Sequence, residues 1–162
     1  MKILFLCTHN SCRSILSEAL FNHVAPEGFT GYSAGSFPSG QVNPLSLQAL
    51  ARAGVSAVGL HSKSSDVFEQ LAPDIVITVC DKAAGEACPL YLGSAIRTHW
   101  GLSDPSELAC DNTLGEEYIN AAFDACVAKI QQRISALLAL PLNALFLDKV
   151  QLQVALDGIG EL

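Results

Sequence analysis

The chain has 162 residues, of which 50% are hydrophobic and only 15% are charged, and its formal net charge is −7. This length and composition predict one domain with a sizeable core and exclude a largely disordered chain. Lysines and arginines do not cluster anywhere, which argues against nucleic acid or an anionic membrane as a partner. A small anion stays compatible, because one arginine in a pocket of amides outweighs a distant acidic surface.

The six cysteines are expected to be reduced thiols. The amino-terminal residues do not resemble an export signal, because only five apolar residues separate Lys2 from polar Thr8. No apolar run approaches the length of a membrane span. We therefore expect a cytoplasmic protein with no membrane partner, in which thiols are catalytic, bind a metal or are simply buried.

In chain order, the apolar pattern alternates between strands and helices. Strands are predicted over residues 2–7, 29–34, 74–79 and 96–100, and helices over 15–24, 44–54 and 65–71. This alternation predicts an α/β fold with a parallel, doubly wound sheet.

A long helix is predicted to follow the last strand. Thr113 and Glu116 form a capping box before it, and Pro141 stops it after about residue 140. Its apolar positions fall on one face: Ile119, Phe123, Cys126, Val127, Ile130, Ile134, Leu137 and Leu138. Residues 1–140 are expected to form the domain. Residues 141–162 are expected to form a helical tail, with a helix closed by Gly158, packed on the domain or on a second subunit.

The stretch CTHNSCRS, residues 7–14, lies between the first predicted strand and the first predicted helix. Ligands of parallel sheets bind beyond the carboxyl ends of strands, and the following helix directs free amides at the same place. These amides suit a tetrahedral oxyanion and favour the nucleophilic thiolate of Cys7. Arg13 can hold two oxygens of the anion at once. Ser14 can donate to the Cys7 sulfur, and Asn10 tolerates a left-handed backbone.

The loop CTHNSCRS resembles the signature loop of the low-molecular-weight protein tyrosine phosphatases and of the arsenate reductases that share their fold. The resemblance covers residues 2–140 and implies a four-stranded parallel sheet flanked by helices. His9 departs from the glycine that is common at its position in the phosphatase form of the motif. The residues implied to bind the oxyanion are Thr8, His9, Asn10, Ser11, Cys12, Arg13 and Ser14.

The pair Asp104-Pro105, in HWGLSDPSE, follows the last predicted strand. Both families carry an Asp-Pro pair whose aspartate is the general acid, and the resemblance implies that role for Asp104. On its own, Asp-Pro is an ordinary turn signal. The tyrosine pair that usually follows it in the phosphatases is replaced here by Ser106 and Glu107, and an acidic Glu107 would repel a phosphopeptide.

Reduction of arsenate needs a second thiol to attack the Cys7 sulfur and release arsenite, whereas a phosphocysteine needs only water. Cys80 ends the strand DIVITV, which should neighbour the first strand, so its thiol is expected at the same sheet edge as Cys7. Cys88 follows in a loop. Thioredoxin-coupled arsenate reductases carry a similar pair, and the resemblance implies that Cys80 is the resolving thiol and Cys88 the final shuttle. Two buried structural thiols are the alternative.

The expected function is therefore the reduction of arsenate for detoxification. A low-molecular-weight tyrosine phosphatase is the alternative. A thiol metal-binding or sensor protein, with zinc on Cys7, Cys12, Cys80 and Cys88, is the third hypothesis, although the spacing does not match that of zinc knuckles. No bound cofactor or metal is expected. Thioredoxin, or glutathione with glutaredoxin, is the expected reductant, and a monomer or weak dimer the expected state.

Overall fold

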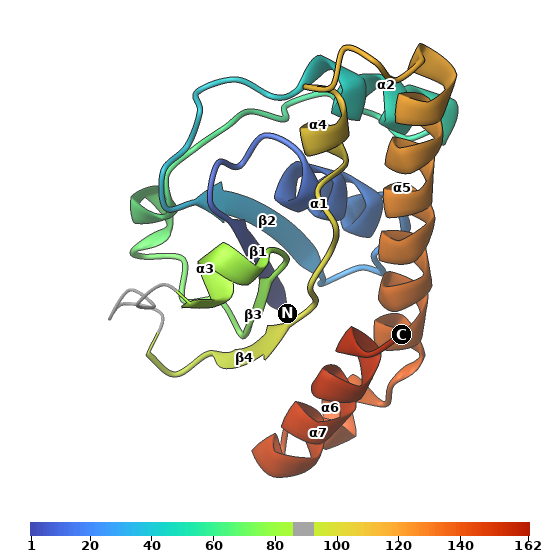
Figure 1. Ribbon diagram of the computed structural model, residues 1–162. Coiled ribbons are helices and arrows are strands. Elements are labelled where there is room, and N and C mark those ends of the chain that lie inside the picture. Colours follow the sequence, from blue (N-terminus) through green and yellow to red (C-terminus); the bar gives the residue numbers. More distant parts are fainter. Residues whose placement is uncertain (86–92) are drawn as a thin grey trace.

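The computed structural model describes residues 1–85 and 93–162. At its centre is a parallel sheet with the strand order β2-β1-β3-β4 (Figure 1). The strands are β1 (Lys2–Cys7), β2 (Thr30–Gly35), β3 (Ile75–Thr78) and β4 (Ile96–His99). Each lies within one residue of its predicted range, because buried parallel strands appear in a sequence as short continuous apolar runs. The predicted fold class, a parallel α/β sheet of the low-molecular-weight phosphatase type, is confirmed.

The side chains of β1 alternate between two apolar clusters, one on each face of the sheet. Ile3 and Phe5 belong to the larger cluster, which α1 (Arg13–Val24) and α5 (Glu116–Ala139) cover. Leu4 and Leu6 belong to a smaller cluster on the other face. Because β1 is buried on both faces and pairs with β2 and β3, the backbone of its last residue, Cys7, is held firmly in place.

Sequence periodicity is a weaker guide to the shorter helices than to the strands. Helix α2 (Pro44–Arg52) was predicted, and the side chain of Asn43 caps it by accepting from the amide of Leu45 at 2.9 Å. The predicted helix over 65–71 is one 3₁₀ turn, η1 (Ser65–Phe68). Helices α3 (Asp81–Gly85) and α4 (Pro105–Leu108) were not predicted, because four or five residues are too few to carry a period of 3.6.

The capping-box prediction for α5 was wrong. Helix α5 begins at Glu116 after Gly115, which offers no side-chain cap, and Thr113 instead donates to Asp111 Oδ1 at 2.6 Å. The predicted apolar face of α5 is buried except at its two ends, where Ile119 and Leu138 are partly buried, and Arg133 lies buried on that face as well. A charged residue interrupts the apolar pattern there, so its burial had no sequence signal.

Residues 141–162 fold into α6 (Leu142–Leu145) and α7 (Lys149–Gly160). Helix α7 runs through Gly158, so the prediction that this glycine closes the helix was wrong. It packs on β4 and on α5, and Figure 1 shows it below the carboxyl-terminal end of α5. In the part of the chain that the structure describes, no helix is long and apolar enough to cross a membrane.

Candidate active site

The loop between β1 and α1 is held from outside by the segment that follows β2. The amides of Phe37, Ser39 and Asn43 donate to the carbonyls of Thr8, His9 and Ser11, each at 2.9 Å. In a trans peptide the C=O and the next N–H point in opposite directions. The amides at positions 9, 10 and 12 are therefore turned to the inner side of the loop, where an oxyanion can be bound.

The end of β2 comes close enough to this loop to require a glycine. A Cβ on Gly35 would lie 2.5 Å from the carbonyl oxygen of Thr8 and 3.0 Å from the amide nitrogen of Asn10. Real Cβ atoms essentially never lie 2.5 Å from another heavy atom, so any other residue at position 35 would push the loop away from the sheet.

The sulfur of Cys7 is buried and surrounded by donors. The amide of Asn10 donates to Cys7 Sγ at 3.1 Å, and Ser14 Oγ lies 2.9 Å from the same sulfur. Ser14 Oγ accepts from Asn10 Nδ2 at 2.8 Å, which leaves its own proton free for the sulfur. Both contacts favour a sulfur that carries negative charge, and such a sulfur is a nucleophile.

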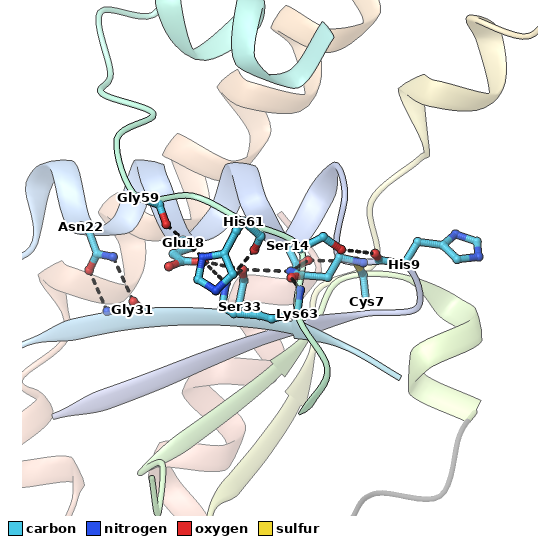
Figure 2. A network of polar contacts seen from close by, with 12 residues as sticks. Cys7, His9, Ser14, Glu18, Asn22, Gly31, Ser33, Gly59, His61 and Lys63 are labelled. Atoms are coloured by element: carbon cyan, nitrogen blue, oxygen red, sulfur yellow. Dashed lines mark hydrogen bonds and ion pairs between the residues drawn. The ribbon is translucent and has the colours of Figure 1, made fainter. Parts of the chain in front are cut away.

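The side chain of Asn10 holds the loop in place through hydrogen bonds. Its φ angle is 46°, the left-handed region expected for it, and it is fully buried. Its Nδ2 donates to Ser33 Oγ at 2.9 Å as well as to Ser14, and its Oδ1 accepts from the amide of Lys63 at 2.9 Å. Figure 2 shows how this network continues to Lys63 Nζ, which lies 3.2 Å from Glu18 Oε2.

Three members of this network, Glu18, Ser33 and Lys63, were not predicted to belong to the site. They come from α1, from β2 and from the segment before η1, and Ser33 also donates to Glu18. A serine in a strand and an isolated lysine carry no spacing that could have marked them. Only the packing of the three segments brings them together.

Arg13 and Asp104 meet across the mouth of the loop. Arg13 donates to Asp104 Oδ2 at 2.6 Å and to the carbonyl of Leu102 at 2.9 Å, and both charged side chains are 16% exposed. Asp104 Oδ1 accepts from the amide and the hydroxyl of Ser106, at 3.0 and 2.6 Å. Asp104 therefore caps α4, and Pro105, as its first residue, supplies the φ angle that the helix needs.

Cys80 lies at the same edge of the sheet as Cys7, two residues after the end of β3. Its buried sulfur is 3.6 Å from Thr8 Oγ1 and accepts from the amide of Ala83, in the first turn of α3, at 3.3 Å. One residue further, Asp81 Oδ1 lies 3.0 Å from His99 Nε2. The expected second thiol therefore lies beside the loop that carries Cys7, while Cys88 lies outside the described residues.

Two other cysteines are inert core residues. Burial raises the pKa of the Cys12 thiol far above its ordinary value, and burial likewise raises the pKa of Cys126 to about 12. A thiol held in its protonated form is a poor metal ligand. Cys12 therefore contributes to the loop through its backbone. Within residues 1–85 and 93–162, no group of three or more candidate ligand side chains could hold a metal ion. Cys110 is exposed.

Comparisons with known proteins agree with this geometry. An arsenate reductase of Shouchella clausii is 35% identical over 105 residues, which cover 65% of this chain and 74% of that protein. A solved thioredoxin-dependent arsenate reductase of Corynebacterium glutamicum is 28% identical, with a TM-score of 0.56 over 83% of this chain and 60% of that one. An arsenate reductase solved in a phosphate-binding state shares the fold, with 24% identity and a TM-score of 0.69 over 85% of this chain and 96% of that one.

The family profile described as low molecular weight phosphotyrosine protein phosphatase matches residues 2–151. This range contains the loop from Cys7 to Ser14, Cys80 and Asp104, and it extends into α7. The chain belongs to the low molecular weight phosphotyrosine protein phosphatase family.

Proposed function

We propose that the protein reduces arsenate to arsenite, in a reducing cytoplasm and for the removal of arsenate. The main support for this proposal is a second buried thiol, that of Cys80, which contacts Thr8 in the loop that carries Cys7. A phosphatase has no chemical use for a thiol there, whereas a reductase needs one. The similarity to arsenate reductases over 65% of the chain supports the same conclusion.

The first half of the reaction uses the loop and Asp104. Arsenate enters among the loop amides and takes the place of Asp104 on the guanidinium of Arg13. The thiolate of Cys7 attacks arsenic, and an As–O bond breaks. Asp104, once released from its ion pair, takes a proton from solvent and donates it to the departing oxygen, which leaves as water. The amides and Arg13 stabilise the charge that develops on the other oxygens.

The second half is a thiol–disulfide exchange. Cys80 loses its proton to solvent and attacks the sulfur of Cys7, so that an S–S bond forms and the S–As bond breaks. The electron pair of that bond stays on arsenic, which leaves as arsenite. Arsenic(V) has then become arsenic(III), and two thiols have become one disulfide. Cys88 attacks Cys80 and frees Cys7, and the two thiols of thioredoxin reduce the disulfide between Cys80 and Cys88. Glutaredoxin with glutathione is the alternative donor.

Removing each thiol of the relay tests this sequence of steps. Cys88→Ser should release one arsenite per protein and stop as a Cys7–Cys80 disulfide, which peptide mapping by mass spectrometry detects after one pulse of arsenate. Cys80→Ser should stop earlier, with arsenic held on Cys7 until an external thiol is added. Cys110→Ser, which removes an exposed thiol, is the matched control and should turn over normally.

The outcome also separates the reductase from a phosphatase. Residual hydrolysis of p-nitrophenyl phosphate needs neither Cys80 nor Cys88 and should survive in both variants. Full activity of Cys88→Ser with thioredoxin would break the three-thiol relay and favour a two-thiol enzyme served by glutathione. Strong phosphatase turnover by the wild type, with no arsenate reduction under any reductant, would assign the protein to the phosphatases.

A further inference from the structure

The carboxyl-terminal helix α7 is hydrogen-bonded to β4 and to the residue that follows it. Thr98 Oγ1 donates to Asp157 Oδ1 at 2.7 Å, and the indole of Trp100 donates to the carbonyl of Leu156 at 3.0 Å. Trp100 is buried, so the second of these bonds is shielded from water. The helix is therefore attached to the strand that leads to Asp104, and is more than a cover for the core.

The last residue of α7 fits this strand without space for a side chain. A Cβ on Gly160 would lie 2.5 Å from the carbonyl oxygen of His99 and 3.1 Å from Trp100 Cδ1. Two residues earlier in the same helix, a Cβ on Gly158 would meet nothing within 4 Å. The contact at Gly160 thus determines how closely the end of α7 approaches the end of β4.

Arg133 joins this helix end to the next stretch of chain. Its guanidinium donates to the carbonyl of Gly101 at 3.0 Å and to the carbonyl of Gly160 at 2.7 Å, and the residue is 6% exposed. Among the residues that the structure describes, no carboxylate forms an ion pair with it. Burial of a guanidinium group is costly, and here the group holds two backbone carbonyls from different segments.

The contact of Arg133 with Gly101 holds one end of the stretch from Gly101 to Asp104, which leads from β4 to the proposed general acid. Arg13 holds the same stretch through the carbonyl of Leu102 and the carboxylate of Asp104. Between this stretch and α5 lies a pocket of about 360 Å³, lined in part by Ala122 and Ala125. Few atoms support the stretch from that side. Its position therefore depends on Arg133 at Gly101, on Arg13, and on the amide of Leu102, which donates to the carbonyl of Val79 at 3.2 Å.

We propose that the end of α7 positions Asp104 for proton donation. It acts through the contact of Gly160 with the end of β4 and through Arg133 of α5, which joins Gly160 to Gly101. This inference rests on the proposed role of Asp104 as general acid. Gly160 and Arg133 are positioning residues: neither touches the substrate, and both act through the stretch from Gly101 to Asp104. The carboxyl-terminal tail would then be a part of the catalytic apparatus rather than an appendage of the domain.

Gly160→Ala is the direct test, with Gly158→Ala as the matched control in the same helix. The new methyl group forces the helix end or β4 to move by about 1 Å before the contact becomes an ordinary one. We expect kcat for arsenate to fall about tenfold with little change in KM, because misplacement of this size is costly at a reacting group. Gly158→Ala should leave both constants unchanged.

A double-mutant cycle separates positioning from general damage. In an Asp104→Asn background, Gly160→Ala should change kcat by less than about twofold, because the group that it positions is already absent. An equal tenfold loss in both backgrounds would overturn the proposal, and so would a wild-type kcat in Gly160→Ala itself. Arg133→Lys can hold only one of the two carbonyls, so it should lower kcat with Asp104 present and have little effect in the Asp104→Asn background. This variant provides the test if Gly160→Ala fails to fold.

Binding of inorganic phosphate gives a second measurement that does not depend on turnover. If Asp104 moves away from Arg13, the phosphate Kd of Gly160→Ala should tighten by about threefold in calorimetry, and this gain should vanish in the Asp104→Asn background. A gain that persists there, or an unchanged Kd with Asp104 present, would contradict the proposal. An inactive wild type would refute arsenate reduction, yet this binding cycle would still test the positioning of Asp104.

Discussion

Replacing Asp104 by asparagine separates its proposed action as a proton donor from its ion pair with Arg13. The side chain keeps its size. Asparagine also remains a good helix cap, so its oxygen is expected to stay on Ser106, where Asp104 Oδ1 accepts from both the amide and the hydroxyl. The amide nitrogen then faces the guanidinium of Arg13, and two donors cannot bond each other. The variant thus loses the acid and frees Arg13.

Both consequences have an expected magnitude. Loss of a general acid should lower kcat for arsenate about 10²-fold or more. Free Arg13 no longer has to exchange a carboxylate for the anion, and a hydrogen bond to a charged group contributes about 1.5 kcal/mol at the lower end of its range. That lower end applies because the pair is partly exposed to solvent. The phosphate Kd should therefore tighten by up to about tenfold.

Arsenate turnover with thioredoxin and its reductase measures the first effect, and calorimetry with phosphate measures the second. Asp124→Asn is the control, because Asp124 pairs with Arg52 at 2.7 Å on the surface, away from the loop. It removes one negative charge and one Arg–Asp pair and should change neither quantity. A kcat within about twofold of the wild type would refute the acid role. Weaker phosphate binding would refute the competition between Asp104 and the anion for Arg13.

Three further substitutions probe the loop itself. Cys7→Ser should abolish both arsenate reduction and any residual phosphatase activity, and substantial arsenate turnover by this variant would remove Cys7 as the nucleophile. Arg13→Lys should retain the charge yet lose most activity, because an ammonium group cannot keep both contacts of the guanidinium fork; wild-type kinetics would make Arg13 structural. Asn10→Ala should lower the free energy of unfolding by roughly 2 kcal/mol or more, since it removes three side-chain hydrogen bonds and strains a left-handed backbone. Denaturant titration checks this against Asn143→Ala, an exposed position in α6 that should be neutral.

The sequence alone determined the sheet and the position of Cys7, the proposed nucleophile. Buried strands such as 74–79 leave an apolar run, and CTHNSCRS lies between a strand and a helix, so both are local patterns that need no knowledge of the fold. The left-handed backbone of Asn10 and the contact of Ser14 with Cys7 were also predictable. They depend on residue type and on a separation of a few residues along the chain.

Only the tertiary structure decided which distant residues support that loop. Lys63 and Ser33 reach Asn10 from segments far along the chain, and Arg133 joins Gly101 to Gly160 from the buried face of α5. Such contacts are set by the packing of whole elements, so the residues that make them have no characteristic spacing. Local rules also mislead where several caps compete, as when Thr113 bonds Asp111 instead of capping α5. The choice between such alternatives depends on the free energy of the whole packed molecule, which no short window of sequence contains.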